Sequence, residues 1–69
     1  MNIAVYRILV WRKGYNDWTP QAVSFAGSKR SILALFAEAV QMAGQQNWRR
    51  VVACNGGYLT GEYLADWHA

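Results

Sequence analysis

The sequence predicts a small α+β domain with a two-layer ββαββ fold, in which a four-stranded antiparallel sheet carries one helix on one face. Strand-like alternation occupies both ends of the chain, and a helical period occupies its middle. The 69 residues, 54% of them hydrophobic, are enough for one core and too few for two. We therefore expect residues 1–69 to form a single domain.

The first strand is expected from Ile3 to Arg12, a segment rich in β-branched and aromatic residues. Alternation predicts that one face of it carries Ala4, Tyr6, Ile8 and Val10, and the other Ile3, Val5, Arg7, Leu9 and Trp11. Turn chemistry from Gly14 to Asp17 leads into a second strand, Thr19 to Ala26. The resulting register pairs Ile8 with Val23, Tyr6 with Phe25, and Trp11 with Pro20. Because proline cannot donate a hydrogen bond to a ladder, this second strand is expected at an edge of the sheet.

A helix is expected from Lys29 to Ala43, with Ser28 as its N-cap and Gly44 in the left-handed position that ends it. Apolar residues recur at helical spacing and form one core-facing stripe: Ile32, Leu35, Phe36, Ala39, Val40 and Ala43. Lys29 and Arg30 occupy the first turn, where the helix dipole prefers anions. With Ser28 they form a candidate anion-binding site, and the alternative is that they are ordinary solvated charges.

The third strand is expected from Trp48 to Cys54, and Asn55–Gly56 predicts a tight hairpin turn after it. That turn pairs Val52 with Leu59, Ala53 with Tyr58, and Arg49 with Glu62. Thr60 is expected to cap a final helical turn through Glu62, Tyr63 and Leu64.

One helix covers only one side of such a sheet, so the other side is expected to face water or a partner. On the predicted register that side carries Val5, Arg7, Leu9, Trp11, Trp18, Pro20, Ala22, Arg49, Val51, Ala53 and Tyr58. Aliphatic, tryptophan and arginine side chains on one surface are typical of binding interfaces. Two alternatives stay open. The Lys13–Trp18 loop or the C-terminal residues Tyr63, Leu64 and Trp67 fold over this side and enlarge the core, or a homodimer forms through it.

Enzymatic activity is not expected, because catalysis needs a positioned acid, base or nucleophile. The chain offers one histidine, one cysteine and four carboxylates, which are scattered along its length. His68 is penultimate, where fraying is normal, and Cys54 is expected to be a small buried filler. One cysteine and one histidine do not complete a zinc site, and Asn55–Gly56–Gly57 lacks the lysine and helix of a phosphate loop. Neither a metal nor a cofactor is expected.

Composition also predicts the compartment. A lone cysteine cannot form an internal disulfide, which fits a reducing cytoplasm. Charged residues interrupt every apolar stretch before it reaches about 20 residues, so neither a membrane span nor a signal peptide is expected. The formal net charge of +3 favours anionic partners only mildly.

The ordered features resemble those of small phage-encoded inhibitors, of which type I anti-CRISPR proteins are the best-known examples. The resemblance rests on the ββαββ order, a helix ending Gln41–Met42–Ala43, Asn47, a Val51–Val52 strand, a tight turn, Tyr58–Leu59 and a closing helical turn. It implies a phage or prophage origin and a non-enzymatic protein that occupies a host machine, such as the CRISPR surveillance complex, a transcription regulator or a pilus motor. The net charge of +3 departs from the acidic, DNA-mimicking members of this group.

Two functions follow as hypotheses. The first is stoichiometric binding to a bacterial host protein, with Trp11 and Trp18 as anchors, Arg7, Lys13 and Arg49 as orienting charges, and Tyr58 completing the patch. The second is a small single-stranded nucleic-acid-binding module, in which aromatic side chains stack on bases. We prefer the first, because exposed Val5, Leu9 and Val51 suit a protein better than phosphate.

Overall fold

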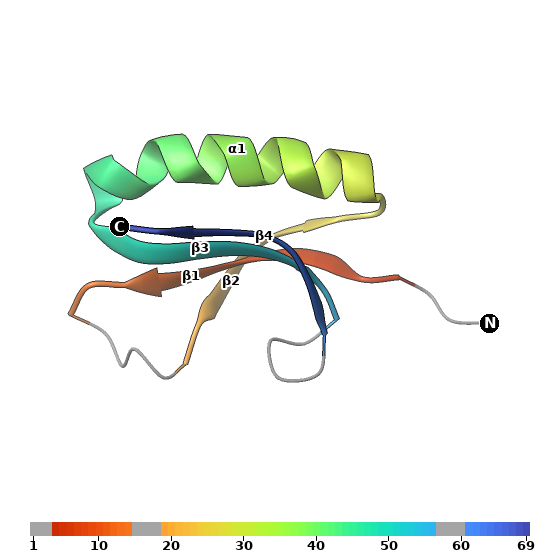
Figure 1. The fold of residues 1–69 in the computed structure, drawn as a ribbon, viewed down its shortest axis with the longest axis horizontal. Coiled ribbons are helices and arrows are strands. Elements are labelled where there is room, and N and C mark those ends of the chain that lie inside the picture. The colour runs from red at the N-terminus through yellow and green to blue at the C-terminus, as the bar shows by residue number, and fades with distance from the viewer. Residues whose placement is uncertain (1–3, 15–18, 57–60) are drawn as a thin grey trace.

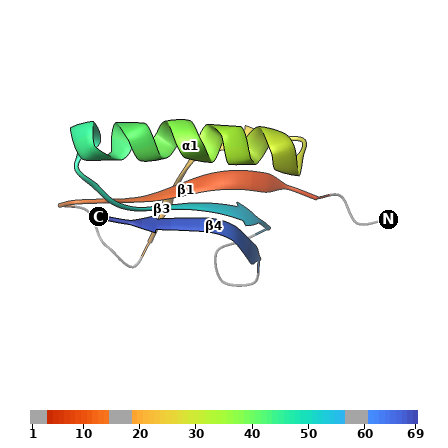
Figure 2. The ribbon, with the colours of Figure 1, turned by 45° about the horizontal axis from the view of Figure 1, so that its top comes forward.

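The computed structural model describes residues 4–14, 19–56 and 61–69. Its element order is β1 (Tyr6–Arg12), β2 (Gln21–Ala26), α1 (Lys29–Gln46), β3 (Trp48–Asn55) and β4 (Glu62–His68). The strands form one antiparallel sheet in the order β2-β1-β3-β4, and α1 lies along one face of it (Figure 1). Figure 2 shows β1, β3 and β4 running side by side beneath the helix. The predicted ββαββ fold class is confirmed, and β2 lies at an edge of the sheet as expected.

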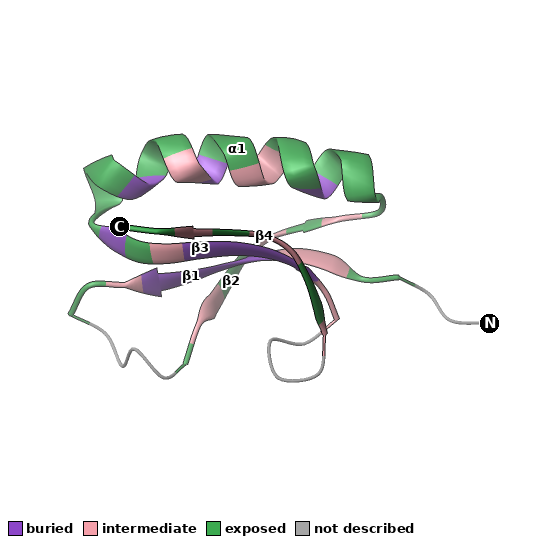
Figure 3. Ribbon diagram, in the orientation of Figure 1, coloured by how far each residue is buried: buried purple, intermediate pink, exposed green. Residues whose placement is uncertain are grey.

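The main core lies between α1 and the two central strands, where burial is concentrated (Figure 3). Its fully or almost fully buried members are Ile8, Val10, Ile32, Ala39, Ala43, Trp48, Val51 and Ala53. The predicted helical stripe is confirmed, because all six of its residues belong to this cluster or pack against it. The cluster buries apolar area from both layers at once, which is the main stabilising contribution to the fold.

Strand β1 begins at Tyr6, three residues later than expected. Its faces divide as predicted. Tyr6, Ile8 and Val10 join the core beneath α1, whereas Leu9 and Trp11 belong to a separate cluster on the other side of the sheet.

The predicted register of the first hairpin is wrong by one residue. Ile8 pairs with Ser24 and Arg7 pairs with Phe25, because Val23 is an extra residue in β2 between the pairs Ile8–Ser24 and Leu9–Ala22. The connection is also longer than Gly14–Asp17, since β1 ends at Arg12 and β2 begins only at Gln21. Pro20 therefore precedes β2 and does not pair with Trp11.

The helix continues one turn beyond the predicted end. Gly44 lies within α1, and Asn47 takes the left-handed conformation at φ 56° while its N–H donates to the carbonyl of Ala43. Asparagine tolerates this conformation better than other non-glycine residues, so it replaces the expected glycine cap. Among the described residues, no helix has both the length and the apolar composition needed to cross a membrane.

The predicted second hairpin is also wrong. Val52 pairs with Asp66 and Ala53 with Ala65, so the segment expected to close the chain as a helical turn is strand β4. Gly56 does lead out of β3 with φ 91°, and a Cβ there would lie 3.3 Å from the Cα of Gly61. The close approach places Gly56 and Gly61 at the base of a longer connection. Glu62 pairs with Asn55 and not with Arg49, and the proposed cap and partners Tyr58, Leu59 and Thr60 lie outside the described residues.

A bulge in β3 changes which residues face the helix. Trp11 pairs with Arg50 and Arg12 with Trp48, so Arg49 is an extra residue between them. Trp48 and Val51 consequently both lie on the helix side. Val51 and Ala53 are therefore core residues, and the expectation that they lie on the uncovered side is wrong.

Candidate functional site

The sheet face away from α1, which we call the open face, is organised in rows of directly paired residues. One row runs from Phe25 through Arg7 and Cys54 to Tyr63. The next contains Ala22, Leu9, Val52 and Asp66, and the last contains Trp11, Arg50 and His68. All four strands therefore contribute side chains to this face.

The centre of the open face is a second, smaller core. Leu9 is 4% exposed, Trp11 is 8% exposed, and Val52 and Cys54 are fully buried. These residues belong to the two central strands, where side chains of β2 and β4 flank them and the guanidinium of Arg50 lies over the indole. The expectation that Leu9 and Trp11 are exposed is therefore wrong, and Trp11 is a packing residue instead of a surface anchor.

Arg50 spans one half of the open face. Its guanidinium carbon lies 4.7 Å from the ring centroid of Trp11 and 5.4 Å from that of Tyr63. Its Nε and Nη2 donate to the two carboxylate oxygens of Asp66 at 3.0 and 2.6 Å. This forked hydrogen bond is the strongest geometry for an arginine–carboxylate pair, and it fixes the guanidinium over both rings.

The pKa values of the pair shift in the directions that this contact requires. The hydrogen bond from Arg50 lowers the pKa of Asp66 below its ordinary value. Burial opposes this shift, and electrostatic interactions with Arg50 and His68 lower the pKa further. The hydrogen bond to Asp66 raises the pKa of Arg50. Both groups are therefore ionised at neutral pH.

Arg7 makes the corresponding stack on the other half of the face. Its guanidinium carbon lies 5.5 Å from the ring centroid of Phe25, which is 63% exposed. The Nε of Arg7 is buried and has no hydrogen-bond partner among the described residues. Beside it, burial raises the pKa of the Cys54 thiol, and the charge of Arg7 only partly offsets that effect. Cys54 is thus an uncharged filler between two arginine–aromatic stacks.

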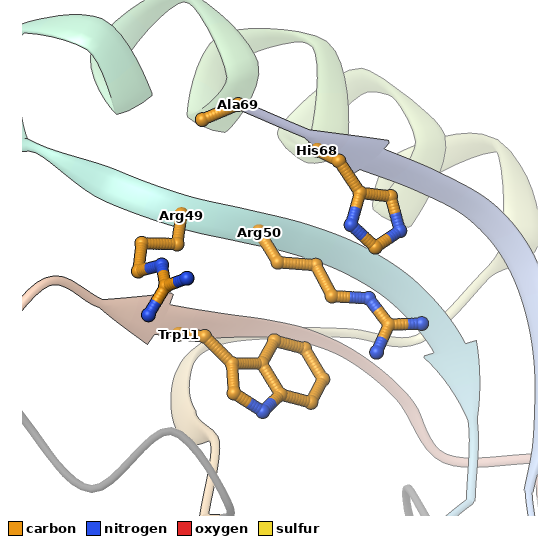
Figure 4. Close-up of a pocket in the computed structure, with 5 residues that line it drawn as sticks. All are labelled: Trp11, Arg49, Arg50, His68 and Ala69. Atoms are coloured by element: carbon orange, nitrogen blue, oxygen red, sulfur yellow. The ribbon is translucent and has the colours of Figure 1, made fainter.

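A shallow basic hollow of about 280 Å³ opens at one end of this face, lined by Trp11, Arg49, Arg50, His68 and Ala69. Figure 4 shows the side chains of Arg49 and Arg50 projecting from β3 near the indole, with His68 on β4 beyond Arg50. His68 Nε2 lies 3.2 Å from Asp66 Oδ1, so this carboxylate contacts both basic neighbours. The hollow therefore combines cationic groups with one partly accessible aromatic edge.

The structure brings together only some of the predicted binding residues. Arg7 lies on the open face, and Arg49 is exposed at its bulge beside the hollow. Lys13 is exposed beyond the end of β1, where its backbone N–H donates to the carbonyl of Asn47. Trp18 and Tyr58 lie outside the described residues.

Several residues of the open face were not predicted to lie there, among them Phe25, Arg50, Tyr63 and Asp66. Phe25 was assigned to the helix side by the incorrect register. Arg50 lies on the open face because of the bulge at Arg49, which has no sequence signal. Asp66 was missed because Glu62–His68 was expected to begin as a helical turn. Tyr63 was expected on this side only in the alternative in which C-terminal residues cover it, and the other two residues of that alternative, Leu64 and Trp67, pack against the core on the helix side. The aromatic residues at Tyr63 and Trp67 were the available signal for a strand.

One residue of the candidate anion site, Ser28, has a structural role at the start of α1. Ser28 is confirmed as the N-cap, and its Oγ accepts a hydrogen bond from the backbone N–H of Ser31 at 3.1 Å. Lys29 and Arg30 are exposed, and the first turn of the helix has no acidic residue. Anion binding there stays a prediction.

Within the described ranges, no group of three or more His, Cys, Asp or Glu side chains is placed to hold a metal ion. Comparison with protein-family models, with curated proteins and with solved structures finds no match for this chain. Its class is therefore defined by its own architecture, an α+β protein with a ββαββ sheet and an arginine–aromatic open face.

Proposed function

We propose that this chain is a non-enzymatic binding protein that docks its open face on an acidic, partly apolar surface of a larger protein. The observation that carries the proposal is the pair of arginine–aromatic stacks, Arg7 on Phe25 and Arg50 on Trp11 and Tyr63. Phe25 and Tyr63 end the same row of paired residues at opposite edges of the sheet. They replace Trp11 as the proposed anchors.

The chemistry of this face suits a protein partner. Arginine and aromatic side chains are enriched among residues that dominate binding energies. Arg50 is already held by Asp66 and by two rings, so little side-chain entropy remains to be lost when a partner binds. Because Asp66 offsets the charge of Arg50, Arg7 carries the positive charge beside the aromatic side chains of this face, which favours a moderately acidic partner surface.

The proposed partner is a bacterial host protein, and the proposed consequence is inhibition by occlusion. The support is the resemblance of the element order to small phage-encoded inhibitors, for which the host CRISPR surveillance complex is the first partner to test. Cys54 is a free, buried thiol, which fits action in the reducing cytoplasm of the host.

A second candidate is single-stranded nucleic-acid binding through the same face. It is favoured by one observation: Leu9 and Val51, which argued for a protein partner, are buried. What stays accessible is rich in aromatic and arginine side chains, which stack on bases and pair with phosphates. Against it, two donors of Arg50 are already occupied by Asp66.

Affinity capture from bacterial lysate with four matched baits tests the first candidate. The face variants are Phe25→Ala and Tyr63→Ala, and the controls are Leu33→Ala and Gln41→Ala, which remove exposed side chains of α1 away from the open face. A partner retained by the wild type and both controls but weakened by about 2 kcal/mol in each face variant supports the proposal. Equal capture by face and control variants contradicts it.

Titration with single-stranded DNA and RNA tests the second candidate. Trp11 borders the basic hollow, so tryptophan fluorescence reports binding at this face. Nucleic-acid binding predicts saturable quenching that weakens steeply between low and high salt. Absence of a saturable response excludes nucleic-acid binding and is consistent with protein binding.

A further inference from the structure

The outer edge of β2 is the least protected edge of the sheet. The order β2-β1-β3-β4 leaves this edge without a paired strand among the described residues. The residues of β2, Gln-Ala-Val-Ser-Phe-Ala, include neither a charge nor a proline. By contrast, the opposite edge strand β4 carries Glu62, Asp66 and His68. Natural proteins usually protect edge strands with charges, proline or bulges. Strand β2 has the bulge at Val23 but neither a charge nor a proline, so its edge is suited to pairing with another strand.

Exposed apolar side chains flank this edge on both faces of the sheet. Phe25 is 63% exposed on the open face, and Val23 is 36% exposed at the bulge. On the helix side, Val23 and Met42 line a groove of about 370 Å³ together with Ser24, Leu35, Ala39 and Trp48. Met42 is 47% exposed. A strand added at this edge would therefore bury apolar area above and below its own backbone.

The groove is also complementary in charge to a second copy of itself. Arg12 and Glu38 both line it, and neither forms an ion pair with another described residue. Arg12 stacks on Trp48 with its guanidinium carbon 6.0 Å from the ring centroid, and its buried Nε has no partner within the described part of the chain. Each groove thus offers one cation and one anion for a neighbour of opposite sign.

From these three features we propose that the chain forms a two-fold symmetric dimer by antiparallel pairing of β2 with the β2 of a second copy. Antiparallel pairing of identical edges requires a two-fold axis perpendicular to the sheet. That axis keeps both helices on one side, brings the two grooves together, and places Arg12 of one copy on the same side as Glu38 of the other. The two open faces then form one continuous face of an eight-stranded sheet, available to a partner.

Sedimentation velocity over a concentration series tests the dimer directly. The test variant is Val23→Lys, which places a charge at the edge, and the matched control is Leu33→Lys, since Leu33 has the same 36% exposure but lies on α1. We expect the wild type and the control to dimerise alike, and Val23→Lys to raise the dimer dissociation constant at least about tenfold. A wild type that stays monomeric throughout the series overturns the proposal, as does a dimer that Val23→Lys leaves unchanged.

Two further measurements keep the test decisive if Val23→Lys perturbs folding. Glu38→Arg changes only an exposed helix residue and is expected to raise the dissociation constant at least about threefold, because two arginines then meet across the axis. Concentration-dependent amide shifts in NMR spectra are expected in Gln21–Ala26. Shifts confined to Tyr63 and His68 would show pairing through the open face and contradict edge pairing. Neither measurement needs the proposed host partner, so the two proposals can fail separately.

Discussion

Arg50 explains why Trp11 is buried on a sheet face that no helix covers. Its guanidinium lies over the indole, and Asp66 holds the guanidinium in that position. The arginine side chain thus shields the indole from solvent while its charged head group stays at the surface. The same side chain is presented to any partner that approaches the face, so packing and binding depend on one residue.

The first residue-scale prediction concerns Trp11. Because this side chain is 8% exposed, Trp11→Ala is expected to lower the free energy of unfolding by about 3 kcal/mol, the usual cost of deleting a buried aromatic. Trp11→Phe should give an intermediate loss. Phe25→Ala, which removes a side chain that is 63% exposed, should cost less than about 1 kcal/mol. Urea unfolding of the three variants is the measurement, and equal losses at Trp11 and Phe25 would contradict the assignment of Trp11 to the core.

The second residue-scale prediction concerns the pH dependence of stability. The folded pKa of Asp66 lies below the ordinary value of 3.8, chiefly because Arg50 donates a hydrogen bond to it. A lowered folded pKa means that the ion pair stabilises the protein above the ordinary aspartate range, and that this contribution is lost as pH falls through the folded pKa. The stability difference between the wild type and Asp66→Asn should therefore be largest near neutrality and shrink in acid. Carboxyl carbon NMR titration should place the Asp66 midpoint below that of an unfolded aspartate, and a midpoint above it would contradict the pairing.

At the scale of elements, core faces were predicted correctly where the apolar residues recur with a regular period. The alternation of Tyr6, Ile8 and Val10 and the helical spacing from Ile32 to Ala43 correctly identified core faces, because many residues contribute to each period. Single-residue features were missed. The bulges at Val23 and Arg49 each insert one residue without any distinctive composition, and each reverses the side on which the following residues lie.

The helix end supplies a prediction at this scale. Asn47 has φ 56°, a conformation that costs most residues about 1–2 kcal/mol. Asn47→Ala should lower the free energy of unfolding by about 1 kcal/mol, which corresponds to about 4–8 °C in Tm for a chain of this size. Asn47→Gly should be neutral or stabilising, because glycine adopts this conformation without strain. Thermal unfolding followed by circular dichroism distinguishes the two, and equal effects would contradict the left-handed cap.

At the scale of the whole molecule, fold class was predictable and the composition of the binding face was not. The ββαββ order needs only the type and sequence of the elements, whereas the membership of a face needs every register to be correct. Arg7 was correctly predicted to lie on the open face, because it belongs to β1, the one strand whose alternation was assigned correctly. Tyr63 and Asp66 depend on a long-range pairing of β3 with β4 that a misleading Asn55–Gly56 signal obscured. Host targeting and inhibition stay predictions.

The three strand pairings of this sheet each contain one irregular step, at Val23 in β2, Arg49 in β3 and Leu64 in β4. Each step is a point where the backbone already absorbs a surplus residue, so removing that residue restores regular pairing on both sides without displacing neighbouring strands. Chain length can therefore change by one at these positions at small cost to folding. Deleting one of these residues should therefore leave the rows of the open face in place and remove only the surplus side chain.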